Sequence, residues 1–225
     1  MAPLVSVIVP VLDDTAAATA LVGQIEPDPR EEIILVDGGS DAELDRLAGH
    51  RADLRLIRTA GGRGRQMNAG AAIARGGWLF FVHADSRLPA GWLDIFTHLT
   101  REASGGWFRF ALDDPAWQAR VIERGVYWRV RALGLAYGDQ GLFVRRDLFE
   151  RIGGYAGMPL MEDVEFVRRL RRQPGIVEVS LPLATSSRRW RRDGWWRRSA
   201  INLALVTLYF AGVSPHRLAR WYAKL

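Results

Sequence analysis

The chain has 225 residues, of which 48% are hydrophobic, and it contains no cysteine. This length and apolar content argue for one domain with a sizeable core and against a disordered chain. The absence of cysteine excludes disulfide scaffolds, thiolate nucleophiles, iron–sulfur clusters and cysteine-ligated zinc. The N-terminal residues MAPLVSVIVP lack the pattern of a secretory signal, so we expect a cytoplasmic protein.

The net charge of +6 is concentrated in the C-terminal part of the sequence. From Met161 onward there are 13 Lys and Arg against 5 Asp and Glu, whereas the preceding residues carry a small negative charge. Lys224 is the one lysine in the chain, and all other cations are arginines. The planar guanidinium suits the recognition of phosphates and carboxylates, although a GC-rich genome produces the same bias.

The first half of the chain alternates predicted strands and helices. Apolar runs rich in β-branched residues predict buried strands at 4–10 and 33–36, and helical spacing over 15–25 connects them into a βαβ unit. The same alternation continues with a strand at 54–58, a helix at 66–74 and a strand at 78–82. This pattern predicts an α/β fold with a parallel sheet whose ligands bind at the carboxyl ends of the strands.

The second half is less regular but contains no linker. Its predicted elements are a strand at 107–112, a helix at 115–133, a strand at 142–144, and helices at 146–152 and 162–172. The apolar run at 199–213 is shorter than the roughly 20 residues needed to cross a bilayer, so it predicts a buried or interfacial helix. We expect one structural unit, with a main domain at 1–185 and a basic, aromatic helical extension at 186–225 packed on it.

Acidic residues follow three of the predicted strands. Asp13 and Asp14 come after the first strand, Asp37 after the second and Asp85 after the fourth. Any one of them alone would more often be a turn residue or a helix cap. Their convergence on one edge of a parallel sheet instead favours a shared site.

These carboxylates suit a hard divalent cation such as Mg²⁺ or Mn²⁺, which commonly bridges protein oxygens and substrate phosphates. Arg63 and Arg65 follow two glycines and open a predicted helix, where cations and free backbone N–H groups could hold a phosphate. A solvated loop is the alternative for this segment. The phosphate-loop patterns of P-loop NTPases and Rossmann dehydrogenases are absent, which disfavours both classes.

Six segments, in this order, carry a resemblance to a known family: SVIVPVLDD, ILVDGGSD, RGRQMNAGA, FVHADS, GDQGLFVRR and MEDVEFVRRL. Together they resemble an inverting family 2 glycosyltransferase of the GT-A fold, over nearly the whole chain. The similarity is greatest to a small bacterial subgroup associated with radical-SAM and selenodomain proteins, of the arsenosugar-biosynthesis type. The resemblance implies a Rossmann-like, mostly parallel sheet flanked by helices. It also implies transfer of a sugar from a nucleoside-diphosphate sugar to an acceptor hydroxyl with inversion.

The resemblance also assigns residues to the donor site. The expected nucleotide-binding residues are Pro10, Asp13, Asp14, Asp37, Arg63, Arg65, Asn68, His83 and Ala84. The family's D-x-D motif aligns with His83-Ala84-Asp85, which makes Asp85 the expected ligand of a Mn²⁺ or Mg²⁺ cofactor. Because His83 replaces the first Asp, the metal requirement is open, and a strand-end histidine satisfied by a neighbour is the alternative for this position.

The Glu162-Asp163 pair matches the family's E-D motif at the start of a helix. The resemblance implies that Asp163 is the general base, with Glu162 beside it in the catalytic site. Without the resemblance, two acids in the first turn would be read as favourable partners of the helix dipole.

Two further segments resemble acceptor-side elements of the family. Asp139 and Gln140 are expected to hydrogen-bond sugar or acceptor hydroxyls, with a plain turn as the alternative. The segment SSRRW resembles the Q-x-x-R-W element of processive relatives, but Ser186 stands in place of Gln, which argues against a processive synthase. Arg189 and Trp190 remain candidates for contacts with the diphosphate and the acceptor.

Residues 188–198 contain six arginines and three tryptophans directly before the apolar run. We rank three explanations: a structural helix whose arginines pair with the acidic front half, peripheral membrane contact through 188–222 at the inner face, and nucleic-acid binding last. A homo-oligomer formed through the same helix is a further option.

Two other functions compete with sugar transfer. The segment GGRGR faintly matches the loop of sugar nucleotidyltransferases, but there the loop follows the first strand, whereas here it follows the third. A non-catalytic module that binds membrane or nucleic acid would explain the basic tail but not the ordered acids of the front half.

Overall fold

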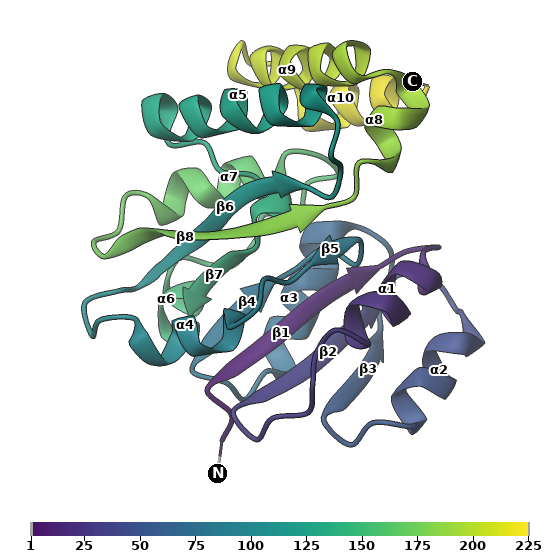
Figure 1. Ribbon diagram of the computed structural model, residues 1–225, viewed down its shortest axis with the longest axis vertical. Helices are drawn as coiled ribbons and strands as arrows, with labels where there is room; N and C mark the ends of the chain where they lie inside the picture. Colours follow the sequence, from purple (N-terminus) through teal and green to yellow (C-terminus); the bar gives the residue numbers. More distant parts are fainter. Residues whose placement is uncertain (1, 225) are drawn as a thin grey trace.

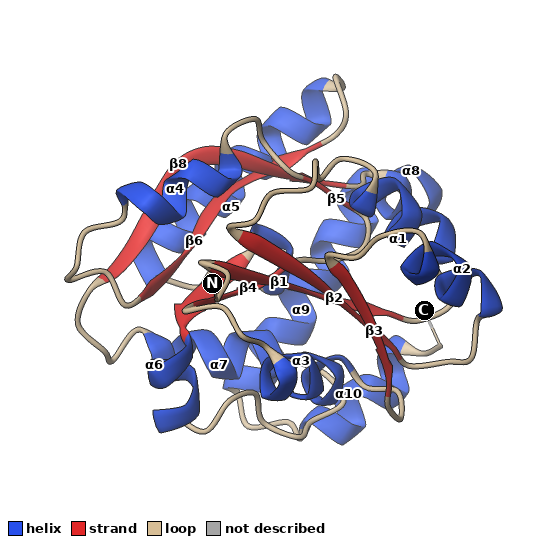
Figure 2. Cartoon of the chain, turned by 90° about the horizontal axis from the view of Figure 1, so that it is seen from below, coloured by secondary structure: helices blue, strands red, loops and turns tan. Residues whose placement is uncertain are grey.

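A curled eight-stranded sheet with helices on both faces forms the centre of the protein, shown here by a computed structural model that describes residues 2–224 (Figures 1 and 2). The strand order is β3-β2-β1-β4-β7-β6-β8-β5. The strands are β1 Val5–Val11, β2 Glu31–Asp37, β3 Leu54–Arg58, β4 Trp78–Phe81, β5 Ser86–Arg87, β6 Gly105–Leu112, β7 Leu142–Arg145 and β8 Ile176–Thr185.

Strands β1 to β4 are parallel, as the alternation of strands and helices predicts. Their register pairs Val11 with Asp37 and Ile8 with Phe81, so their carboxyl ends lie at one edge. Strand β7 is antiparallel to both β4 and β6, and β5 is antiparallel to β8. The predicted α/β class with a mostly parallel sheet is confirmed, with these two strands as its antiparallel members.

The helices are α1 Thr15–Val22, α2 Ala42–Gly49, α3 Arg63–Ile73, α4 Trp92–His98, α5 Trp117–Leu133, α6 Arg146–Arg151, α7 Glu162–Leu170, α8 Arg188–Asp193, α9 Trp195–Phe210 and α10 Pro215–Tyr222, with the short 3₁₀ helix η1 Gly138–Gln140. The predicted helices agree with these to within a few residues. The sequence pattern did not predict α2, α4, β5 or β8, and it predicted α8 and α10 only as parts of the helical extension at 186–225. Strand β8 was missed because it contains Pro182, which is rare inside strands, and because only part of it is buried.

Two apolar cores cover the two faces of the sheet. Val7 and Val9 of β1 point to one face, which holds Phe80, Phe108 and Phe143 beneath α1 and α4. Ile8 points to the other face, toward α3, α6 and α7, because successive strand residues alternate. On that face α3 packs against β1 through a glycine: a Cβ on Gly70 would lie 2.5 Å from a methyl carbon of Ile8. This close packing fixes where the first turn of α3 lies relative to the ends of the strands.

Helices α9 and α10 fold back against α7 at one end of the molecule (Figure 1), and Trp190 of α8 packs against β6 and α5. Their contacts form a smaller core of Met161, Val164, Leu205, Val206 and Leu218. The predicted apolar helix at 199–213 is part of α9, which begins earlier, at Trp195. Glycines with positive φ lie at or just beyond both ends of α9, Gly194 at 87° and Gly212 at 92°. Within residues 2–224, no helix combines the length and apolar character needed for a membrane span.

Glu31 generates a prediction about pH. It begins β2, at the end of the sheet opposite Asp37, and neither carboxylate oxygen has a hydrogen-bond partner. Burial, together with the charge of Asp53, raises the pKa of Glu31 from 4.5 to about 7. The folded protein therefore holds more protons than the unfolded chain within this pH window, so its free energy of unfolding falls as the pH rises from 4.5 to about 7.

Replacing Glu31 by Gln removes this loss. We expect the E31Q variant to match the wild type at about pH 4 and to be more stable by roughly 1–3 kcal/mol at about pH 8. Urea unfolding at both pH values measures the difference. An advantage of equal size at the two pH values would contradict the assignment.

Candidate functional site

A cleft of about 540 Å³ lies at the carboxyl ends of β1 and β4. Most of the residues that the sequence analysis assigned to a site line it: Pro10, Asp14, Arg63, His83, Ala84, Asp85, Asp139, Glu162, Asp163, Arg189 and Trp190. The opposite wall comes from α8, α9 and α10. The C-terminal extension is therefore part of the site.

The strand-end carboxylates Asp14 and Asp85 are bridged by an arginine of α8. Arg188 forms an ion pair with Asp14, and its Nη2 lies 3.8 Å from Oδ2 of Asp85. Arg191, one turn further on, pairs with Asp114 and helps to hold the pKa of that carboxyl below its usual value. Both ion pairs join the basic tail to the acidic front half of the chain. Of the three explanations given for the arginines of residues 188–198, this is the structural one, which was ranked first.

Asp163, in the first turn of α7, is held by backbone N–H groups. Its Oδ2 accepts a hydrogen bond of 2.8 Å from the Gly138 N–H, and its Oδ1 accepts one of 2.8 Å from the Val164 N–H. Gly138 approaches the site closely: a Cβ there would lie 2.9 Å from His83 Nε2 and 3.4 Å from Asp163 Oδ2. The η1 loop thus fixes the orientation of the Asp163 carboxylate.

Glu162 is buried beside Asp163 and pairs with Arg63 from the first turn of α3. The Arg63 Nη1 lies 3.2 Å from Glu162 Oε1. Burial raises the pKa of Glu162, and the neighbouring Asp163 raises it further, while Arg63 opposes both effects. The pair links two helices that lie far apart in the sequence, and it places a cation next to both acids.

His83 is neutral in this cleft. Burial lowers its pKa well below 6.5, and the charges of Arg63 and Arg189 lower it further. Its Nε2 is buried and has no hydrogen-bond partner. The Nε2 atom lies close to Gly138, so a hydrogen bond to a neighbouring side chain, the alternative considered for this histidine, is not seen at this atom.

Asp139 of η1 also has a polar atom without a partner in the cleft, because its Oδ1 is buried and accepts no hydrogen bond. Burial raises its pKa to about 6, with a smaller contribution from Asp163, and Arg129 acts in the opposite direction. The cleft therefore contains a carboxyl group that exchanges its proton close to neutral pH.

Two non-glycine residues have positive φ within residues 2–224, and each directly precedes an acid of the cleft. Asp13 has φ 53° before Asp14, and Met161 has φ 68° before Glu162. A left-handed conformation is unfavourable for a side chain such as that of Met161, and such strain is concentrated at functional sites.

Five of the assigned residues do not line the cleft: Asp13, Asp37, Arg65, Asn68 and Gln140. Asp13 and Arg65 point into solvent. Asp37 is buried, and its carboxylate accepts hydrogen bonds from the N–H groups of Gly39 and Asp41 in its own turn. The acids after the strands do gather at one edge, but Asp37 serves the loop there.

Asn68 and Gln140 have internal partners in place of the ligand contacts expected of them. The Asn68 amide donates to the Tyr155 carbonyl and accepts from the Tyr155 N–H, both at 2.8 Å. The Gln140 amide donates to the Phe108 carbonyl at 3.2 Å and accepts from the Tyr137 N–H at 3.3 Å. Both are polar side chains that satisfy buried backbone groups.

Several lining residues were not assigned from the sequence: Gln66, Tyr137, Arg188, Arg198 and Tyr222. The Gln66 amide donates hydrogen bonds of 2.8 Å to the carbonyls of Val11 and Val36, which ties the ends of β1 and β2 together. Arg198 donates to the Tyr222 hydroxyl and so anchors α10 to α9. Arg188 and Tyr222 both belong to the basic, aromatic segment at 188–222, but no motif in the sequence assigns either of them to the cleft.

Asp85, the expected ligand of a divalent cation, lines the cleft. Within residues 2–224, no cluster of three or more acidic or histidine side chains could hold a metal ion by itself. A single carboxylate nevertheless fits Mg²⁺ or Mn²⁺ when substrate phosphates and water complete the coordination. The donor set therefore suits a cation that arrives with a diphosphate better than one held by the protein alone.

The contacts of Asn68 give a test of its role. Asn68→Ala removes two hydrogen bonds and leaves the Tyr155 backbone groups without partners, so we expect the free energy of unfolding to fall by roughly 1–3 kcal/mol. Affinity of the folded variant for a nucleoside diphosphate should be unchanged. Urea unfolding and isothermal titration measure the two effects, and a loss of affinity with unchanged stability would restore Asn68 to the donor site.

Two solved structures are similar to this chain in fold. The mannosyltransferase PcManGT from Pyrobaculum calidifontis, solved with GDP-Man and Mn²⁺, matches with a TM-score of 0.59 and 18% identity, over 81% of this chain and 55% of that one. TarS from S. aureus matches with a TM-score of 0.64 and 16% identity, over 95% of this chain and 41% of that one. The chain thus spans about half the length of these proteins, with which it shares the GT-A fold.

A comparison with curated protein sequences found no match. The family model described as Glycosyl transferase family 2 matches residues 6–153, which run from β1 to the end of α6 and make up more than half of the chain. This chain therefore belongs to glycosyl transferase family 2.

Proposed function

We propose that this protein transfers a sugar from a nucleoside-diphosphate sugar to an acceptor hydroxyl, with inversion at the anomeric carbon. The observation that carries the proposal is Asp163, a carboxylate oriented by two backbone N–H groups inside a cleft that is also lined with arginines. Family membership supports sugar transfer as the reaction class. The motif resemblance to the small radical-SAM-associated subgroup is part of the same proposal.

The donor would occupy the side of the cleft formed by the ends of β1 and β4. Asp14 and Pro10 lie where a nucleoside would enter, and the cations Arg63, Arg188 and Arg189 surround the place of a diphosphate. The guanidinium group suits phosphate oxygens because of its planar, forked geometry. The GDP-Man bound by PcManGT supports a nucleotide-sugar donor.

The reaction would be a single displacement. Asp163 accepts the proton of the acceptor hydroxyl while that oxygen attacks the anomeric carbon, and the bond between this carbon and the diphosphate oxygen breaks as the diphosphate leaves with the electron pair. Each Asp163 oxygen accepts one backbone hydrogen bond, so a lone pair remains available for the proton. Attack opposite the leaving group gives inversion.

A divalent cation, when bound, would supply positive charge to the departing diphosphate. Asp85 would hold it, and Arg188, which neutralises Asp85 and Asp14 in the free cleft, would then be released to contact the phosphates. The Mn²⁺ present in the PcManGT complex supports this assignment.

Asp163→Asn tests the catalytic base. The amide keeps the shape of the side chain and can keep one of the two backbone hydrogen bonds, but it cannot take the proton. We therefore expect turnover to fall by about 10²–10⁴-fold while the affinity for the donor is retained. The readout is release of nucleoside diphosphate in the presence of acceptor, with donor affinity measured by titration. Asp147→Asn, on the exposed face of α6, serves as the matched control and should be fully active. Retained turnover in D163N would overturn the assignment.

A thermal-shift series tests the donor site without an acceptor. We expect Mn²⁺ alone to leave the melting temperature unchanged, and one nucleoside diphosphate together with Mn²⁺ to raise it. At a hundredfold excess over Kd, the ligand increases the free energy of unfolding by about 2.7 kcal/mol. Asp85→Asn should lose the Mn²⁺-dependent part of the shift. Absence of a shift with every nucleotide would count against a transferase, and a shift with Mn²⁺ alone would contradict a substrate-bridged cation.

A further inference from the structure

Large exposed apolar side chains gather on two neighbouring helices. Eight of the ten in the described chain belong to α5 and α9: Trp117, Val121, Tyr127, Trp128, Leu133, Trp196, Leu203 and Phe210. We call this surface the α5–α9 face. Exposed apolar patches of this kind mark sites of association rather than ordinary solvated surface.

Helices α5 and α9 run side by side in the same direction. At their N-terminal ends the rings of Trp117 and Trp196 are 5.8 Å apart. At their C-terminal ends Leu133 and Phe210 line one pocket. Figure 1 shows both helices together at the end of the molecule far from β3. Trp117, Val121 and Trp128 share one side of α5, and Trp196, Leu203 and Phe210 share one side of α9, so most of these side chains form two neighbouring stripes.

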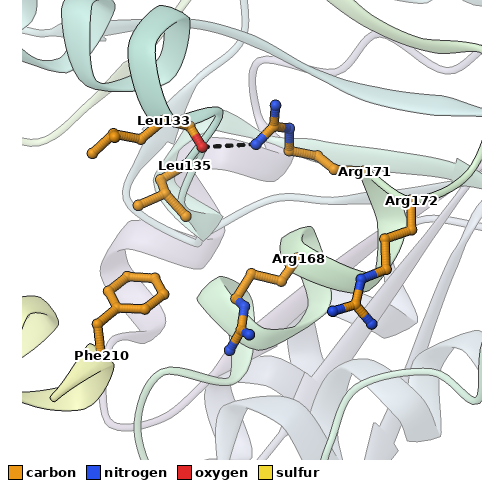
Figure 3. A pocket seen from close by; sticks show the side chains of 6 residues that line it. All are labelled: Leu133, Leu135, Arg168, Arg171, Arg172 and Phe210. Carbon is orange, nitrogen blue, oxygen red and sulfur yellow. Dashed lines mark hydrogen bonds between the residues drawn. The ribbon is translucent and has the colours of Figure 1, made fainter. Parts of the chain in front are cut away.

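The shared pocket, of about 580 Å³, has an apolar side and a cationic side (Figure 3). Leu133, Leu135 and Phe210 form the apolar side, and Arg168, Arg171 and Arg172, here called the rim arginines, form the other. The Arg168 guanidinium lies 5.6 Å from the Phe210 ring, and Arg171 donates a hydrogen bond of 2.7 Å to the Leu133 carbonyl.

The three rim arginines have no acidic partner. Within residues 2–224, none of their guanidinium groups lies within 4.0 Å of a carboxylate, although the adjacent Arg169 pairs with Glu165. The pocket therefore combines three uncompensated positive charges with apolar surface. This combination matches an anion that has an apolar part, such as a phosphate group at the head of a lipid.

The rest of the face carries the same sign of charge. Helices α9 and α10 contain no Asp or Glu, and the one acid of α5, Glu123, pairs with Arg120. By contrast, most arginines of the 188–198 segment are occupied within the protein: Arg188, Arg191, Arg192 and Arg198 each pair with an aspartate. The free positive charge thus lies around the α5–α9 face more than along that segment.

We propose that the α5–α9 face docks on the surface of an anionic lipid bilayer, with its tryptophans and leucines in the interfacial region and the pocket arginines on lipid phosphates. Tryptophan favours this interface, and each arginine near an anionic surface adds about 1 kcal/mol of attraction. The charges around this face are mainly positive, so two copies of it would repel each other in a symmetric dimer, which disfavours self-association. The proposal goes beyond sugar transfer and does not depend on it.

Co-sedimentation with lipid vesicles tests the proposal on the whole chain. We expect binding to vesicles of phosphatidylcholine mixed with phosphatidylglycerol, weakening with added salt, and little binding to phosphatidylcholine alone. The R168Q/R171Q/R172Q variant should lose at least about tenfold in affinity. The W117S/L203S variant should lose a similar factor, because exposed apolar side chains no longer enter the interface.

A variant with the same change in charge elsewhere provides the control. R46Q/R101Q/R151Q removes three exposed arginines outside the α5–α9 face and should bind nearly as well as the wild type. If the two triple variants lost equal vesicle affinity, the binding would depend only on net charge and not on the α5–α9 face, and the proposal would be overturned. Self-association without vesicles that W117S/L203S abolishes would assign the face to a second copy instead.

The test is independent of the proposed reaction. All substituted side chains lie outside the cleft, so any thermal shift with nucleoside diphosphate should be unchanged in every variant, and the melting transition without ligand reports that each one folds. Failure to bind vesicles with an intact nucleotide shift would overturn the docking surface alone.

Discussion

The charge balance of the cleft is the constraint on which the rest of the structure depends. The parallel strands bring acids to one edge, and a half-buried group of carboxylates is costly unless cations lie beside it. Arg63 supplies one from the start of α3, next to Glu162, and Arg188 supplies another from α8, between Asp14 and Asp85. The C-terminal helices therefore fold back over the sheet edge, and the site contains elements from both ends of the chain.

Burial complements these ion pairs by changing which groups are charged. It lowers the pKa of His83, which removes a cation, and it raises the pKa of Glu162 and Asp139, which makes their carboxylates easier to neutralise. Asp163 differs from its neighbours because two backbone N–H groups satisfy its carboxylate directly. One cleft thus contains acids in distinct environments, a condition for one of them to act as a base while others bind or position the substrates.

The features that depend on local sequence pattern could be predicted from the sequence. Strand and helix periodicity gave the α/β class, and acids directly after strands gave Asp14 and Asp85 as residues of one cleft. It could not give Arg188 as the partner of Asp14, because 174 residues separate them and no periodicity relates them. Nor does residue type distinguish a ligand contact from an internal one: Asn68 and Gln140 stand in the expected motifs, yet their amides satisfy the backbone of neighbouring loops.

Helix α9 belongs to two surfaces at once. Leu205 and Val206 face the cleft, while Leu203 points outward. Glycines with positive φ, Gly194 and Gly212, lie between the helix and its neighbours at the two ends. Because one helix forms part of both surfaces, a change in the position of α9 would alter the cleft and the outer face together. Linkage then requires reciprocity: a substrate that favours one seating of α9 must strengthen, by the same factor, whatever contact favours that seating from outside.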